Sequence, residues 1–194
     1  APENVAWVLN IRGYDNPTSP IPNSNLLISK NSKKFIIASK IRLKKLIKEK
    51  KIKINEIIEP KNIELIFSKL GGKNISIDKK SCSVNYERVL SKKFKIIKKD
   101  DPIYFLKSIK NKTEITNMIK AHISDGVALT KFIYWIKKVN KKRITEVDAQ
   151  NKLEEFRKQN RNYLFPSFDT IAGSGKNAAI VHYRANKKNT KIIK

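Results

Sequence analysis

Apolar residues recur with two different periods along the first hundred residues of the chain. Five short runs alternate or concentrate β-branched and aromatic residues, as half-buried strands do. They cover residues 5–9, 25–29, 35–39, 75–78 and 94–97. Two further segments, 42–51 and 62–70, repeat apolar residues every three or four positions, which is the helical period. Strands that alternate with helices predict an α/β module with a mixed sheet over residues 1–100.

The composition changes near residue 101. Asp100 and Asp101 interrupt a long basic stretch, and Pro102 disfavours helix at the residue before it. We therefore expect a domain boundary here, with residues 101–110 as a linker between the first module and the segment 111–194.

The longest helical pattern in the sequence begins after this boundary. Asn111 can cap a helix, and Glu114, three positions later, completes a capping box. The apolar stripe that follows predicts a helix over residues 113–139, long enough to span a domain. Its members are Ile115, Met118, Ile119, His122, Ile123, Leu129, Phe132, Ile133, Ile136 and Val139. A stripe of this length requires another element to cover it.

A second capping pair, Thr145 and Asp148, opens another helical pattern that ends near Phe156. Two β-rich runs, 167–175 (SFDTIAGSG) and 177–183 (NAAIVHY), then flank a Gly-Ser-Gly turn. They predict a β-hairpin with His182 at the end of its second strand. Such a platform can aim a catalytic side chain, although by the residues alone a histidine bonded within the hairpin is slightly favoured.

Charge introduces nucleic acid as a possible partner. The formal net charge is +26 at pH 7, and Lys and Arg attract phosphate groups through counterion release. The basic residues are 36 Lys and only 7 Arg, however, and they occur in every segment. Arg is the better bidentate reader of bases and phosphates, so this dispersed Lys pattern is typical of a solvated surface. We expect no specific nucleic-acid partner.

The remaining composition favours a folded protein of the cytoplasm. Apolar residues make up 40% of the chain, which argues against disorder throughout. No run of about eighteen uncharged apolar residues occurs, so no membrane partner is expected, and no basic-then-apolar leader opens the sequence. Cys82 is the only cysteine, which excludes an internal disulfide and fits a reducing compartment.

Several of these stretches together resemble the Xaa-Pro aminopeptidases, or aminopeptidase P family, which are metallopeptidases of the creatinase or pita-bread fold. The resemblance covers 5–15 (VAWVLNIRGYD), the entry 101–115, the helical segments 118–129 and 145–157, and residues 167–183. It implies an α/β protein with a creatinase N-terminal-like, mixed-sheet middle domain over 1–100. An incomplete α+β pita-bread domain would follow over 111–194, with its first two helices and first β-hairpin.

The resemblance also implies an activity and candidate site residues. Proteins of this family are hydrolases that release an N-terminal residue preceding proline from peptides, and they commonly form homodimers. It places His182 as a catalytic residue that donates a hydrogen bond to the substrate or to the tetrahedral intermediate. Arg12 and Asp15 become candidates for substrate binding; the alternative is that Gly13 simply allows a turn in which Arg12 pairs with Asp15.

The family implies two divalent metal ions, with manganese the most favoured, held by two Asp, one His and two Glu. In this sequence no acidic residue follows Asp169, so we expect the ligands to lie beyond residue 194 and assign no metal ligand here. The chain alone is therefore predicted to be inactive. Two alternatives stay open: a non-catalytic binding or adaptor protein of the same fold, and a non-specific nucleic-acid binder.

Overall fold

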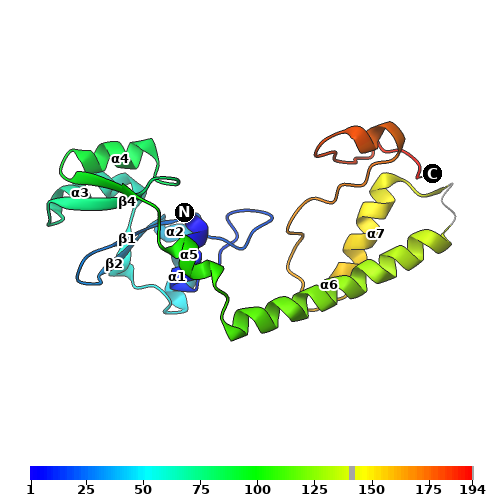
Figure 1. Ribbon diagram of the computed structural model, residues 1–194, viewed down its shortest axis with the longest axis horizontal. Helices are drawn as coiled ribbons and strands as arrows, with labels where there is room; N and C mark the ends of the chain where they lie inside the picture. The colour runs from blue at the N-terminus through cyan, green and yellow to red at the C-terminus, as the bar shows by residue number, and fades with distance from the viewer. Residues whose placement is uncertain (140–142, 194) are drawn as a thin grey trace. The chain divides into compact units, whose positions relative to one another are not determined.

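The computed structural model describes residues 1–139 and 143–193, and its course is drawn in Figure 1. The chain divides into two compact units, Ala1–Ile109 and Lys110–Lys194. Each unit is described by itself. None of the helices formed by these residues has both the length and the apolar character needed to cross a membrane.

The first unit contains a three-stranded sheet of mixed direction. Strand β1 (Asn25–Ile28) pairs antiparallel with β2 (Lys34–Ile37), and β2 pairs parallel with the short β3 (Ile57–Ile58). Helix α2 (Lys40–Lys48) and the 3-10 turn η1 (Ile54–Glu56) connect β2 to β3. A tight hairpin can join antiparallel strands, whereas parallel strands require a longer crossover, which α2 provides here.

A second, parallel sheet follows in the same unit. Strand β4 (Asn74–Asp78) pairs with β5 (Lys95–Lys99) over five residues, and α4 (Val84–Ser91) forms the crossover between them. Ser83 caps α4, because its hydroxyl accepts a hydrogen bond from the Tyr86 amide. The 3-10 turn η2 (Pro60–Asn62) and helix α3 (Ile63–Lys69) link β3 to β4.

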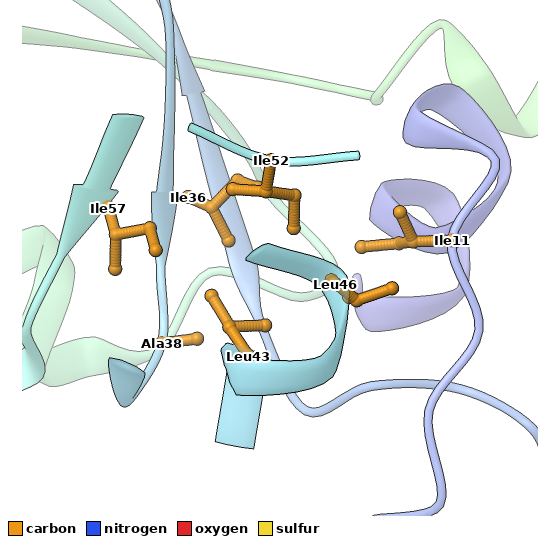
Figure 2. Close-up of a cluster of buried hydrophobic side chains, with 7 residues drawn as sticks. All are labelled: Ile11, Ile36, Ala38, Leu43, Leu46, Ile52 and Ile57. Carbon is orange, nitrogen blue, oxygen red and sulfur yellow. The ribbon is translucent and has the colours of Figure 1, made fainter. Parts of the chain in front are cut away.

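Two hydrophobic clusters form the core of this unit, and successive residues of β2 and β3 belong to different clusters. In β2, Ile36 belongs to one cluster and Ile37 to the other, and their β3 partners Ile57 and Ile58 are divided in the same way. Successive strand residues point to opposite faces, so an uninterrupted apolar pair buries both faces. Figure 2 shows the first cluster, in which Leu43 and Leu46 of α2 reach Ile11, Ile36, Ala38, Ile52 and Ile57.

The structure confirms four of the five expected strands and corrects the first. Residues 25–29, 35–39, 75–78 and 94–97 correspond to β1, β2, β4 and β5, whereas the strand expected at 5–9 lies in helix α1 (Pro2–Leu9). Pro2 stands in the first turn, where its missing N–H costs nothing, and Asn10 ends the helix in a left-handed conformation. Burial of Asn4, Val5 and Ala6 thus outweighs the β propensity of the run.

Residues 103–108, expected within a linker, form the short helix α5 (Ile103–Ser108), which contacts α1. Asp78 at the end of β4 accepts hydrogen bonds from the Asp101 amide and the Tyr104 hydroxyl, while Asp101 accepts one from the Asn4 side chain. These bonds attach the segment to the first unit. The assignment of 1–100, 101–110 and 111–194 to two domains and a linker stays a prediction.

The second unit is built on two helices that lie side by side. Helix α6 (Lys112–Lys138) begins with the expected capping box of Asn111 and Glu114, and α7 (Glu146–Lys158) folds back along it (Figure 1). Arg157 makes two hydrogen bonds to the Asp125 carboxylate, at 2.7 and 3.2 Å, across the pair. Both helices expected from the hydrophobic spacing are confirmed. The 3-10 helix η4 (Gly175–Ala179) follows α7.

Candidate functional site

The segment that carries His182 is an irregular loop, so the hairpin expected over 167–183 was wrong. Among the described residues after α7, only η4, turns and one isolated bridge, between Thr145 and Ile192, are formed. Two strands without a third are only marginally stable. Several backbone donors of this segment bind carbonyls within its turns, whereas those of Ser174 and, farther along, Lys191 bind the side chain of Glu146.

Glu146 is the centre of a buried polar cluster. It is the first residue of α7, directly after the N-cap Thr145, and its side chain is 0% exposed. Its Oε1 accepts the Ser174 amide at 2.6 Å, and its Oε2 accepts the Lys191 amide at 3.0 Å and the Tyr183 hydroxyl at 2.7 Å. The Asn177 amide group lies 3.1 and 3.0 Å from the two oxygens. Four residues thus donate to one carboxylate.

These donors keep the carboxylate charged. Burial by itself would raise the pKa of Glu146, because a charge is costly away from water. The hydrogen bonds from Tyr183, Ser174, Asn177 and Lys191 together exceed that effect and lower the pKa to about 2. Position at the amino-terminal end of a helix favours a negative charge as well. Glu146 is therefore an anion in the folded protein at neutral pH.

Asn177 and Tyr183 complete the cluster from the loop side. Both are buried, and the Asn177 amide also donates to the Tyr183 hydroxyl at 2.8 Å. The carbonyl oxygen of Asn189 lies 3.2 Å from that hydroxyl. Desolvation raises the pKa of Tyr183, and the Glu146 carboxylate raises it further. The phenol therefore stays protonated and can donate. Every member of the cluster has a partner.

His182 precedes Tyr183 and is exposed. Its backbone has a φ of 54°, in the left-handed region that residues other than glycine seldom adopt. Its ring meets the ring of Phe168 edge-on, with 6.1 Å between the centroids. The catalytic role expected for His182 stays a prediction.

Arg12 and Asp15 lie in the first unit, on a cavity of about 340 Å³ that Arg42, Leu46 and Glu49 also line. The structure gives them different partners. Arg12 donates to the Ile11 carbonyl at 2.9 Å, whereas Asp15 accepts the Asn23 amide at 2.7 Å and lies 3.8 Å from Arg42. Their substrate-binding role stays a prediction.

The acidic residues of the second unit serve separate structural contacts. The Asp148 carboxylate accepts from the hydroxyl and the backbone amide of Thr145 in the helix cap, and these hydrogen bonds lower its pKa. Glu154 accepts from the Tyr163 hydroxyl, Glu155 pairs with Lys152, and Asp169 pairs with Arg184 at 2.8 Å. Nowhere in 1–139 or 143–193 do three His, Cys, Asp or Glu side chains gather to hold a metal ion. The described residues therefore do not fit a metal site.

Sequence reasoning missed Glu146 and its partners. Glu146 stands between Thr145 and Asp148, where an acidic residue of the first helical turn is ordinary and suggests no burial. One weak indication of this cluster was present in the sequence. Besides His182, only Asn177 and Tyr183 in the run 177–183 have side chains that can donate a hydrogen bond.

Comparison with known proteins supplies the family context. The family described as Creatinase/Prolidase N-terminal domain matches residues 1–114, and Metallopeptidase family M24 matches residues 116–194. A probable Xaa-Pro aminopeptidase P of Paracoccidioides brasiliensis (strain Pb03) is 34% identical over 207 residues, covering 98% of this chain and 33% of that protein. Xaa-Pro aminopeptidase 1 of Dictyostelium discoideum is 32% identical, covering 98% and 31%.

Among solved structures, the Xaa-Pro dipeptidase from Bacillus anthracis has a similar fold. Its TM-score is 0.59 at 17% sequence identity, over 82% of this chain and 42% of that one. The chain thus spans about a third of the length of the curated relatives that it matches. The mixed α/β architecture of these residues agrees with the fold class expected from the sequence.

Proposed function

Because the chain belongs to the creatinase/prolidase family of metallopeptidases, we propose that it forms part of an aminopeptidase that releases an N-terminal residue preceding proline. The observation that carries the proposal is the alignment of nearly the whole chain, 98%, with relatives named Xaa-Pro aminopeptidase. The two family matches also follow each other along the sequence without a large gap.

In this proposal His182 faces the peptide substrate. An imidazole placed where negative charge develops lowers the barrier more than one that binds only the ground state. The exposed ring and its position beside the buried Tyr183 support such a role, since one side is anchored and the other is accessible. Arg12 and Asp15 of the first unit are candidates for substrate binding in the same proposal.

The described residues provide no group that would hold a divalent ion, so we propose that these 194 residues do not catalyse alone. The metallopeptidase family implies divalent metal cofactors, and two manganese ions are our expectation for an active form. A peptide substrate, a homodimer and a cytoplasmic location belong to the same proposal.

A chimaera tests this proposal. The residues of this chain would replace the matching segment of Xaa-Pro aminopeptidase 1 of Dictyostelium discoideum, of which they cover 31%. We expect the chimaera to cleave Xaa-Pro peptides and the His182→Gln variant to lose kcat by about 10²–10³-fold, the usual effect of removing one donor to the developing charge. Glu155→Gln, an exposed change on α7, is the matched control.

Two results would count against the proposal. A chimaera that folds by circular dichroism yet leaves Xaa-Pro peptides intact would remove the assignment of substrate class. Turnover by the 194-residue chain alone, with manganese added, would contradict the view that its residues hold no catalytic metal.

A further inference from the structure

The loop that carries His182 has few hydrophobic anchors. Between residues 174 and 191, Ile180 is 51% exposed and Val181 is 83% exposed, whereas Tyr183 is 5% exposed. A loop held by apolar burial would turn such side chains inward. Here only Asn177 and Tyr183 are buried, and both end on the Glu146 carboxylate. Hydrogen bonds to the Glu146 side chain therefore hold this loop in place, as buried apolar side chains hold other loops.

The loop is also attached to Glu146 at both ends. The Ser174 amide binds Oε1 and the Lys191 amide binds Oε2, while the Glu146 amide donates to the Lys191 carbonyl at 2.9 Å. The carboxylate thus joins the start, the middle and the end of a stretch of chain that lacks a strand ladder. Loss of one such acceptor releases several backbone and side-chain donors at once.

His182 depends on this arrangement more than its neighbours do. Its left-handed backbone conformation is unfavourable for a residue with a side chain, and it persists only where the surroundings determine it. The next residue, Tyr183, is held by hydrogen bonds to Glu146 and Asn177. The His182 ring itself contacts the ring of Phe168.

We propose that Glu146 is a positioning residue, which acts through Tyr183 and Asn177 to set the orientation of the His182 ring. The inference rests on the proposed function only for the role of the His182 ring in binding the peptide substrate. The positioning itself is a property of residues 146–191.

The variant Glu146→Gln tests this role with little change in volume. A glutamine retains one acceptor oxygen but turns an NH₂ group toward the Ser174 or Lys191 amide, so two donors face each other and one hydrogen bond is lost. Glu155→Gln on the same helix makes the same chemical change at an exposed position, beside Lys152.

The measurement is nuclear magnetic resonance on the 194-residue chain. The protein has two histidines, so the imidazole spectrum contains two sets of signals, and His122 on α6 is an internal reference. We expect Glu146→Gln to shift or broaden the His182 signals, to leave those of His122 in place, and to speed amide exchange at Ser174 and Lys191 at least tenfold. Glu155→Gln should change none of these.

Tyr183→Phe provides a second test if Glu146→Gln does not fold. It removes one hydroxyl donor, keeps the buried ring, and should move the His182 signals in the same direction by a smaller amount. The proposal is overturned if the folded variants keep both the His182 signals and the exchange rates of the unsubstituted chain. A role limited to stability would change the exchange rates and leave the ring signals unmoved, which also overturns it.

No peptide, metal or turnover enters this experiment. Its failure would therefore leave the aminopeptidase proposal standing, and an inactive chimaera would leave the positioning role of Glu146 standing.

Discussion

At the scale of single residues, Glu146 illustrates how a buried charge is tolerated. A carboxylate that leaves water must regain hydrogen bonds from the protein, or it takes up a proton. Glu146 receives donors from four residues, two of them backbone amides. Backbone donors are well suited to this task because they cannot rotate away, so the charge and the loop stabilise each other.

The lowered pKa of Glu146 predicts an acid transition of the loop. A group whose pKa is lower in the folded than in the unfolded state stabilises the fold above its unfolded pKa, and that stability disappears as pH falls toward the folded value. The pKa of Glu146 falls from an ordinary 4.5 to about 2. We therefore expect the amide signals of Ser174 and Lys191 to hold above about pH 4.5 and to change progressively down to about pH 2.

The Glu146→Gln variant is the control for this titration. It cannot gain a proton at position 146, so its loop signals should lose the part of the pH dependence that Glu146 causes in that window. Asp148, whose pKa is also lowered, stays in the helix cap of the variant and accounts for any pH dependence that remains. Identical pH profiles for the two proteins would contradict the assignment of the transition to Glu146.

At the scale of elements, the turn after α1 depends on a close backbone approach. A Cβ atom at Gly13 would lie 2.7–2.9 Å from three atoms of Pro22, two of which are backbone atoms. The Gly13 amide also donates to the Pro20 carbonyl at 3.1 Å, which holds the two sides of this loop together. This turn places Ile11 in the core that Figure 2 shows.

Replacement of Gly13 by alanine should therefore destabilise the first unit. We expect Gly13→Ala to lower the free energy of unfolding by about 1–3 kcal/mol, the usual cost of a forced steric shift. The matched control is Gly71→Ala, where a Cβ would meet nothing within 4 Å, and where a change between zero and a gain of about 1 kcal/mol is expected. Urea denaturation followed by Trp7 fluorescence in a Trp135→Phe background measures both. Equal stability of the two variants would refute the steric argument.

At the scale of the whole molecule, the net charge of +26 governs association with other polyelectrolytes. The structure engages some of this charge in exposed pairs, such as Lys98 with Glu87 and Lys79 with Asp100. Exposed pairs of this kind contribute little stability and are screened by salt. An excess of Lys over acid remains, as it does in the sequence, and it can attract any polyanion without regard to sequence.

Binding of nucleic acid should therefore be weak and salt-sensitive. In a filter-binding titration with duplexes of two unrelated sequences, we expect equal affinities that fall by at least about 10³-fold between 50 and 200 mM salt, as counterion release dictates for several phosphate contacts. Affinity that persists at 200 mM salt, or that differs between the duplexes, would favour the nucleic-acid alternative over the peptidase.

Much of the fold followed from local pattern. Hydrophobic periodicity located both long helices of the second unit and four strands of the first, because amphipathic spacing and capping pairs such as Asn111 with Glu114 act within a few residues of chain. Hydrophobic periodicity did not predict helix α1 or the two-residue strand β3. The first was decided by burial against other elements, and the second is too short to have a period.

The candidate site divides along the same line. Sequence alone determined that a histidine followed by a tyrosine, His182 and Tyr183, lies in the most distinctive stretch of the chain, since residue identity carries that information. Only tertiary structure decided that the stretch would wrap around Glu146 as a loop instead of pairing as a hairpin. Backbone donors bind whichever acceptor lies near, and an acceptor 28 to 45 residues away in sequence is brought near only by folding.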